Sequence, residues 1–153
     1  MKKRIFSLAL SLIIIFSLSV PALAYEPTGF EVNAKSAMLI SLDTEKELYS
    51  KNKDQKMYPA SITKIMTVIL MLESEKYDPE AKIAMTDKIL KTVSGTGSAV
   101  SGLKVGEEVR QIDMVYYVLM SSYGDCAYLV AEYYGGSIDD FVKMMNDKAK
   151  ALG

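Results

Sequence analysis

The chain has 153 residues, half of them hydrophobic and about a quarter charged, which suits a single globular domain. It contains no histidine and one cysteine, Cys126, which excludes a Ser-His-Asp triad, a histidine-ligated metal site, an internal disulfide and a thiolate zinc cluster. The net charge at pH 7 is −1, and no basic patch indicates nucleic acid. A nucleophilic serine in this chain would therefore need a lysine, a carboxylate or a tyrosine as its base.

The first 24 residues have the pattern of a secretory signal peptide. Met1 to Arg4 is a positively charged start, Ile5 to Val20 is an apolar core, and small residues ending at Ala24 form a cleavage site. An uncleaved membrane anchor is the alternative. We therefore predict an exported, extracytoplasmic protein of the cell envelope, on the outer face of the cytoplasmic membrane. We expect no cofactor, because nucleotide cofactors are scarce there, and no metal, because the chain has no histidine and only one cysteine.

The next segments predict a β-hairpin. Residues 37–42 form an apolar run of strand length, residues 43–46 are a polar turn, and Glu47 to Ser50 resume an extended pattern. A polar connector then leads to the segment that begins at Tyr58.

The segment from Pro59 to Leu72 predicts the central helix. Pro59 is a favoured first residue of a helix, and almost every residue after it is apolar. Because a helix that is apolar on every side is normally buried, we expect burial here, with Ser61 and Lys64 at its start. A buried ammonium is costly without a partner or a task, and the task of Lys64 would be to take the proton from Ser61. The alternative is a helix-start serine beside a snorkelling surface lysine.

The rest of the chain predicts mostly helices. In order, we expect a strand at 82–85, a helix at 87–93 capped by Thr86, a flexible loop at 94–98, a turn at 103–108, a buried helix at 111–121, a helix at 126–134 capped by Asp125, and a helix from 138 to about 152 capped by Ser137. The 94–98 loop lacks the Gly-Lys-Ser/Thr ending of a phosphate loop. We expect Cys126 to be a small core residue. We expect core and helix packing, and not a ligand-stacking surface, for Tyr116, Tyr117, Tyr128, Tyr133 and Tyr134.

A family resemblance begins at Ser61-Ile62-Thr63-Lys64, which has the S-x-x-K form of penicillin-binding proteins and serine β-lactamases. It follows Tyr58-Pro59-Ala60, opens an apolar helix and comes after a hairpin in an exported chain. This combination resembles the D-alanyl-D-alanine carboxypeptidases, the low-molecular-weight penicillin-binding proteins, over nearly all of residues 25–153. Further matching segments are Ala37–Ile40, Leu103–Glu107, Ser122–Ala127 with Ala131-Glu132, and Phe141–Gly153.

The resemblance implies an α+β fold of the β-lactamase/transpeptidase type, present here in part. Residues 25–153 would be the N-terminal part of the catalytic domain, an N-terminal β-hairpin plus a helical subdomain, with later sheet strands missing. The family's third motif, K-T-G, which binds the substrate carboxylate, does not occur after Ser122. We therefore expect the sequence to be the front half of a longer protein, with little or no catalysis and poor stability as an isolated chain.

The resemblance also implies residue roles. Ser61 would be the acylated nucleophile, Lys64 the general base, and Ser122 the group that passes a proton to the leaving amine. Gly124 would be a substrate-binding position, but it stands where the family's second motif has asparagine. Losing such a hydrogen-bonding group could cost on the order of 10²–10³ in rate, by analogy with an oxyanion donor. Tyr123 and a water molecule are the candidates for replacing it in part, and Tyr123 is the second expected substrate-binding residue.

The implied function is that of a serine-type D-Ala-D-Ala carboxypeptidase, which removes the terminal D-alanine from peptidoglycan stem peptides. Its partners would be the stem peptide and β-lactam antibiotics as inhibitors, with no nucleic acid, and with membrane association only through a missing C-terminal anchor. One alternative is a non-catalytic penicillin-binding-like protein that binds wall peptides or a partner, which is motivated by Gly124 and by the absence of the third motif. The other is a serine β-lactamase, for which the sequence offers no identifiable deacylation base.

Overall fold

The computed structural model describes Gly29 and residues 31–153, so the predicted signal peptide at residues 1–24 lies outside the described residues. The chain divides between Met57 and Tyr58 into two compact units. Each unit is described by itself below.

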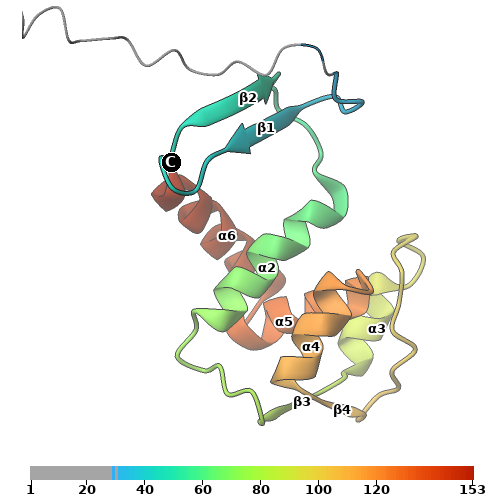
Figure 1. Ribbon diagram of the computed structural model, residues 1–153. Helices are drawn as coiled ribbons and strands as arrows, with labels where there is room; N and C mark the ends of the chain where they lie inside the picture. Colours follow the sequence, from blue (N-terminus) through green and yellow to red (C-terminus); the bar gives the residue numbers. More distant parts are fainter. Residues whose placement is uncertain (1–28, 30) are drawn as a thin grey trace, which may run out of the picture. The chain divides into compact units, whose positions relative to one another are not determined.

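The first unit contains the predicted β-hairpin, which is confirmed. Strands β1 (Ala37–Ile40) and β2 (Glu47–Lys51) pair antiparallel, with Leu39 opposite Tyr49 (Figure 1). The register shifts between Leu39 and Ile40, and β1 ends at Ile40, before the predicted end of the strand. A hairpin of two strands is at best marginally stable by itself, so we expect β1 and β2 to be stabilised by contacts with other parts of the protein.

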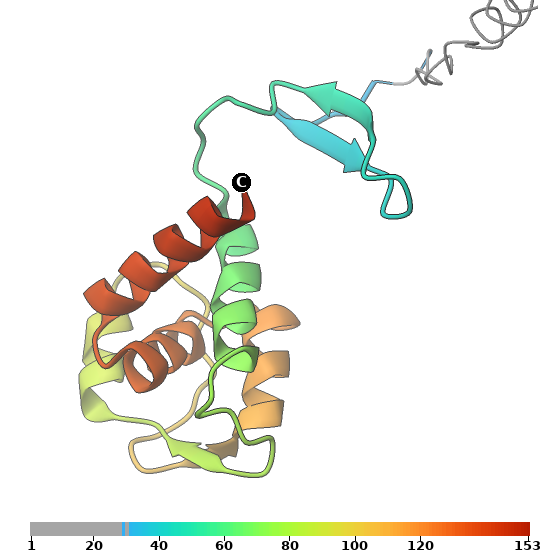
Figure 2. The ribbon, with the colours of Figure 1, turned by 90° about the vertical axis from the view of Figure 1, so that its left-hand side faces the viewer.

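The second unit, Tyr58–Gly153, is a helical subdomain arranged around α5 (Gly124–Gly135). Four helices contact α5, as the two views in Figures 1 and 2 show: α2 (Thr63–Leu72), α3 (Asp87–Val93), α4 (Gln111–Leu119) and α6 (Ile138–Leu152). All five helices contribute to the core, whose side chains of at most 1% exposure include Met71, Ile89, Met114, Val118, Cys126, Val130 and Phe141. The apolar spacing of these helices is therefore satisfied by burial against α5.

The helix caps at Thr86 and Ser137 are confirmed. The Thr86 hydroxyl accepts a hydrogen bond from the Ile89 N–H at 3.2 Å, and the Ser137 hydroxyl accepts one from the Asp140 N–H at 3.0 Å. Such bonds satisfy donors that the first turn of a helix would otherwise leave unpaired. Helices α3, α4, α5 and α6 begin and end within two residues of their predicted limits.

A small antiparallel sheet closes one end of the helical unit. The predicted strand is β3 (Lys82–Ala84), and it pairs with β4 (Glu108–Arg110), which places Ile83 opposite Val109. The predicted turn at 103–108 therefore ends one residue too late, because Glu108 is already part of β4. Strand β4 has only three residues and pairs with β3, which lies more than 20 residues earlier in the chain. The sequence around Glu108 therefore contains no local pattern that predicts a strand.

Helix α2 is not buried on every side, so that prediction is wrong. It begins at Thr63, after a 3-10 turn η1 (Ala60–Ile62), and its buried residues are Thr67, Val68, Leu70 and Met71. The apolar residues on the other side remain open, with Ile62, Ile65 and Leu72 exposed by 68%, 53% and 46%. Within this unit α2 contacts α4, α5 and α6, and these helices cover only one side of it.

Asp125 does not cap α5, so that prediction is also wrong. The helix begins at Gly124, and Asp125 is its second residue, with no exposed surface. The Asp125 carboxylate accepts hydrogen bonds from the Ser101 backbone N–H at 3.0 Å, from the Ser101 hydroxyl at 2.6 Å and from the Cys126 N–H at 2.9 Å. The residue therefore fastens the loop that precedes β4 to the start of α5.

The expected core packing of the tyrosines holds for only some of them. Tyr134 is buried, and burial raises the pKa of its hydroxyl. Tyr117 and Tyr128 are half-buried. Tyr116 and Tyr133 are 60% and 41% exposed, so neither is a core residue, although the Tyr133 ring packs edge-on against the Tyr134 ring with centroids 5.0 Å apart.

Cys126 is buried, as predicted, and we expect its thiol to be inert in the folded protein. Burial, together with the neighbouring Asp125 carboxylate, raises the pKa of the Cys126 thiol to about 12. Because the thiolate is the reactive form, a disulfide reagent at about pH 8 should label the denatured protein fully and the native protein negligibly. Equal rates of labelling for the native and denatured protein, followed by absorbance, would contradict the burial of this side chain.

Candidate active site

Three polar side chains meet where the start of α2 approaches the turn between α4 and α5. The Lys64 Nζ lies 3.3 Å from the Ser61 Oγ and 3.2 Å from the Ser122 Oγ. The Ser122 hydroxyl donates to the Ser61 Oγ at 2.7 Å. All three groups are thus within hydrogen-bond reach of one another, in one cluster.

Local backbone geometry brings these groups together. Ser61 lies in η1 and Lys64 in the first turn of α2, so a spacing of three residues turns both side chains toward the same region. Ser122 follows the end of α4, with a left-handed φ of +57°, and Ala60, next to Ser61, has a φ of +49°. Each such conformation costs about 1–3 kcal/mol in a residue other than glycine and is typical of functional sites. The backbone is therefore strained on both sides of the cluster.

The cluster is open enough to receive a substrate. Ser61 is exposed, while Lys64 and Ser122 are half-buried. A serine hydroxyl within reach of a lysine amine is an arrangement that activates a nucleophile without histidine, and a second hydroxyl can relay a proton. The part of the chain that the structure describes contains no group of three or more acidic, cysteine or histidine side chains that could hold a metal ion.

The two substrate-binding positions predicted from the resemblance differ in their surroundings. Gly124 is buried at the first position of α5, and its N–H donates to the Ala99 carbonyl at 2.7 Å. The Tyr123 ring is half-buried and packs edge-on against the Tyr117 ring, with centroids 5.8 Å apart. Tyr123 is therefore already engaged in packing, and its role in binding substrate stays a prediction.

A cavity of about 250 Å³ adjoins the cluster on the side of Lys64. Its polar lining includes Lys64 and Ser98, and Gly124 borders it. The remaining walls are largely apolar and come mainly from α5 and α6: Ala127, Tyr128, Ala131, Ile138, Phe141, Val142 and Met145. A cavity with few polar groups beside a reactive cluster is typical of a substrate site.

Ser98 is a residue of this site that the sequence did not indicate. It belongs to the segment predicted only as a flexible loop, whose serine and glycine content gave no signal of a fixed position. Its place beside Gly124 results from tertiary contacts of the loop with α5, which no local pattern encodes.

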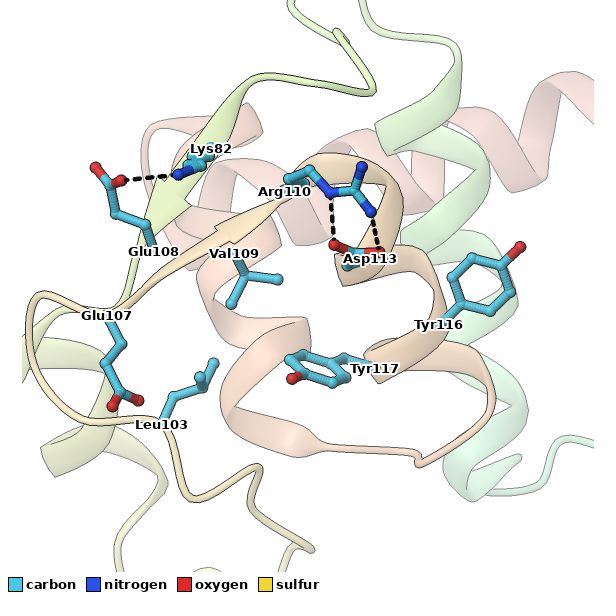
Figure 3. A pocket seen from close by; sticks show the side chains of 9 residues that line it. All are labelled: Lys82, Leu103, Glu107, Glu108, Val109, Arg110, Asp113, Tyr116 and Tyr117. Carbon is cyan, nitrogen blue, oxygen red and sulfur yellow. Dashed lines mark hydrogen bonds and ion pairs between the residues drawn. The ribbon is translucent and has the colours of Figure 1, made fainter.

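A larger groove, of about 700 Å³, lies beside β4 and the start of α4 (Figure 3). Four of its charged groups form ion pairs, Arg110 with Asp113 at 2.8 Å and Lys82 with Glu108 at 3.7 Å, and the Glu107 carboxylate accepts a hydrogen bond from the Lys104 N–H. The Asp113 carboxylate accordingly raises the pKa of Arg110. The groove does not include the Ser61 cluster, and we assign the candidate site to the smaller cavity.

No helix among the described residues is both long enough and apolar enough to cross a membrane.

Comparison with known proteins agrees with the predicted resemblance. The family model of D-alanyl-D-alanine carboxypeptidase matches residues 22–153. DacF, a D-alanyl-D-alanine carboxypeptidase of Bacillus subtilis, is 41% identical over 122 residues, which cover 78% of this chain and 31% of that protein. A D-alanyl-D-alanine endopeptidase of Pseudomonas aeruginosa is 36% identical over 159 residues, which cover 100% of this chain and 50% of that protein.

Solved structures agree as well. A Streptomyces DD-transpeptidase superposes with a TM-score of 0.77 at 26% identity, over 82% of this chain and 50% of that one. Penicillin binding protein 6B from Escherichia coli gives 0.73 at 28% identity, over 84% and 42%. The predicted α+β fold of the transpeptidase type is confirmed, and the chain spans half or less of the length of these relatives. By the extent of these matches, the chain belongs to the D-alanyl-D-alanine carboxypeptidase family.

Proposed function

We propose that the whole protein is a serine-type D-Ala-D-Ala carboxypeptidase that removes the terminal D-alanine from peptidoglycan stem peptides. The observation that carries this proposal is the cluster of Ser61, Lys64 and Ser122, with its three contacts of 2.7–3.3 Å, in a chain of this family. The names of the relatives refer to D-alanyl-D-alanine carboxypeptidase and endopeptidase, which supports this class of substrate.

The first half of the proposed reaction is acylation. Lys64 acts as the base and takes the proton of the Ser61 hydroxyl, and the Ser61 oxygen attacks the carbonyl carbon of the penultimate D-alanine. The Ser61 backbone N–H is one candidate donor to the oxyanion that forms. The carbon–nitrogen bond then breaks, and Ser122 relays the proton from Lys64 to the leaving amine, so that D-alanine departs.

The second half is hydrolysis of the acyl-enzyme. A water molecule loses a proton to the same base and attacks the ester, and Ser61 regains its hydrogen as the shortened peptide leaves. A β-lactam would acylate Ser61 in the same way, because its strained amide occupies the place of the scissile bond. Since the substrate is part of the cell wall, the protein would act outside the cytoplasmic membrane.

A binding protein without turnover is the second candidate. The observation that favours it is Gly124, which has no side-chain amide with which to hold a substrate. A protein of this kind would bind wall peptides or a β-lactam, and it would release no D-alanine.

The deciding experiment uses the intact full-length protein and a synthetic peptide that ends in D-Ala-D-Ala. We expect release of D-alanine that stops after treatment with penicillin, and no release from the matched peptide that ends in L-Ala-L-Ala. Peptide binding without release would favour the binding protein. Rapid hydrolysis of nitrocefin without D-alanine release would instead favour a β-lactamase.

A further inference from the structure

A residue larger than glycine is excluded at position 124 by a steric clash and not by the backbone conformation. Its φ is not in the left-handed region, so an ordinary residue could adopt its backbone geometry. A Cβ atom added at Gly124 would, however, lie 2.7 Å from the Ser98 Cβ and 3.1 Å from the Ser98 Oγ. Contacts as short as the first are not tolerated in close-packed proteins, so the Ser98 side chain occupies the space that a side chain at position 124 would need.

The loop around Ser98 is fixed in this position. The Gly124 N–H donates to the Ala99 carbonyl at 2.7 Å, and the Ser101 hydroxyl donates to the buried Asp125 carboxylate at 2.6 Å. Closer to Ser98, its own N–H donates to the Thr96 hydroxyl at 3.3 Å. Two consecutive residues of α5 thus hold the loop at Ala99 and Ser101, directly after Ser98.

The Ser98 hydroxyl is available to a ligand. It is exposed, and within the described part of the chain it has no hydrogen-bond partner. It lines the same cavity as Lys64, next to the position at which the second motif of the family has asparagine. A hydroxyl can both donate and accept a hydrogen bond, as a side-chain amide can.

We propose that Ser98 supplies the polar contact that Gly124 lacks, so that its hydroxyl binds the peptide amide next to the scissile bond of an acyl-D-Ala-D-Ala substrate. The 94–101 loop then forms one wall of the substrate site. This inference rests on the proposed function. A contact from Ser98 would make a glycine at position 124 compatible with the proposed activity.

The test compares variants of the intact protein by their rate of acylation by a fluorescent penicillin and by kcat and KM for a D-Ala-D-Ala peptide. Ser98→Ala should lower the acylation rate and kcat/KM about tenfold, the effect of one lost hydrogen bond, without lowering the melting temperature. Ser98→Thr keeps the hydroxyl and should stay within about threefold of wild type. Ser94→Ala, in the same loop but away from the cavity, is the matched control and should have the wild-type rate.

A swap of the two positions is the strongest arm of the test. Gly124→Asn alone should lose activity, because its side chain meets Ser98. Combining it with Ser98→Gly opens the space for the asparagine and should restore the rate to within about threefold of wild type. Recovery in the double variant shows that the two side chains compete for one space. Ser98→Gly alone tests the hydroxyl, and it should react as slowly as Ser98→Ala.

The outcomes separate this inference from the proposed function. If penicillin does not label the wild-type protein, the proposed function fails and this inference fails with it. If the wild type is labelled and Ser98→Ala reacts at the same rate, only this inference is overturned. If Ser98→Ala proves unstable, Ser98→Gly decides: a slow rate that Gly124→Asn restores supports the inference, and a wild-type rate in Ser98→Gly overturns it.

Discussion

Replacing Ser61 by alanine should abolish covalent labelling of the intact protein by fluorescent penicillin. It should also lower kcat for D-alanine release by about 10³-fold or more, because the variant has no oxygen to form the acyl-enzyme. Lys64→Ala should have a loss of similar size, since the Lys64 Nζ contacts both serine hydroxyls of the cluster. Groups that act as a unit are not additive, so the double variant should be no slower than the worse single variant.

The control for the Ser61 experiment is Ser121→Ala. Ser121 is exposed and adjoins Ser122 in the chain, but its side chain makes no contact with the cluster among the described residues. We expect normal labelling and normal D-alanine release from this variant. If penicillin still labels Ser61→Ala and mass spectrometry finds the label on another residue, that residue is the nucleophile. This result would refute the role assigned to Ser61.

Features that depend on neighbouring residues were predictable from the sequence. The caps at Thr86 and Ser137 each act on an N–H three residues later, so both partners lie in one short segment. The same is true of Ser61 and Lys64, whose proximity follows from their spacing on one helical turn. The β1–β2 hairpin also has a short connection, and its pattern of apolar residues was sufficient to predict it.

Features that depend on distant contacts were not predictable in this way. The apolar sequence of α2 indicated burial on all sides, yet Ile62 and Ile65 are exposed, because burial depends on which elements surround the helix. Asp125 has the sequence position of a helix cap, but its carboxylate accepts hydrogen bonds from Ser101, in the loop before β4. Only the family pattern connected Ser122 with Lys64, and nothing in that pattern connected Ser98 with Gly124.

Asp125→Ala is the substitution for which we expect the largest loss of stability. It would leave the Ser101 N–H, the Ser101 hydroxyl and the Cys126 N–H without their shared acceptor in the interior. Each buried polar group that loses its partner costs about 1–3 kcal/mol, and relaxation of the loop toward water recovers part of this. We therefore expect the free energy of unfolding of the intact protein to fall by about 2–4 kcal/mol, measured by urea denaturation.

Asp139→Ala is the matched control, since Asp139 is an exposed carboxylate at the second position of α6, as Asp125 is at the second position of α5. Both variants lose the favourable interaction of a negative charge with the start of a helix, which is worth less than about 1 kcal/mol at a surface position. The difference between them therefore measures the buried contacts with Ser101 and Cys126. Because the same contacts fix the 94–101 loop, Asp125→Ala should also slow acylation by penicillin under conditions in which it is fully folded. Equal stability of the two variants would mean that the loop is held by other contacts and that Asp125 does not fasten it to α5.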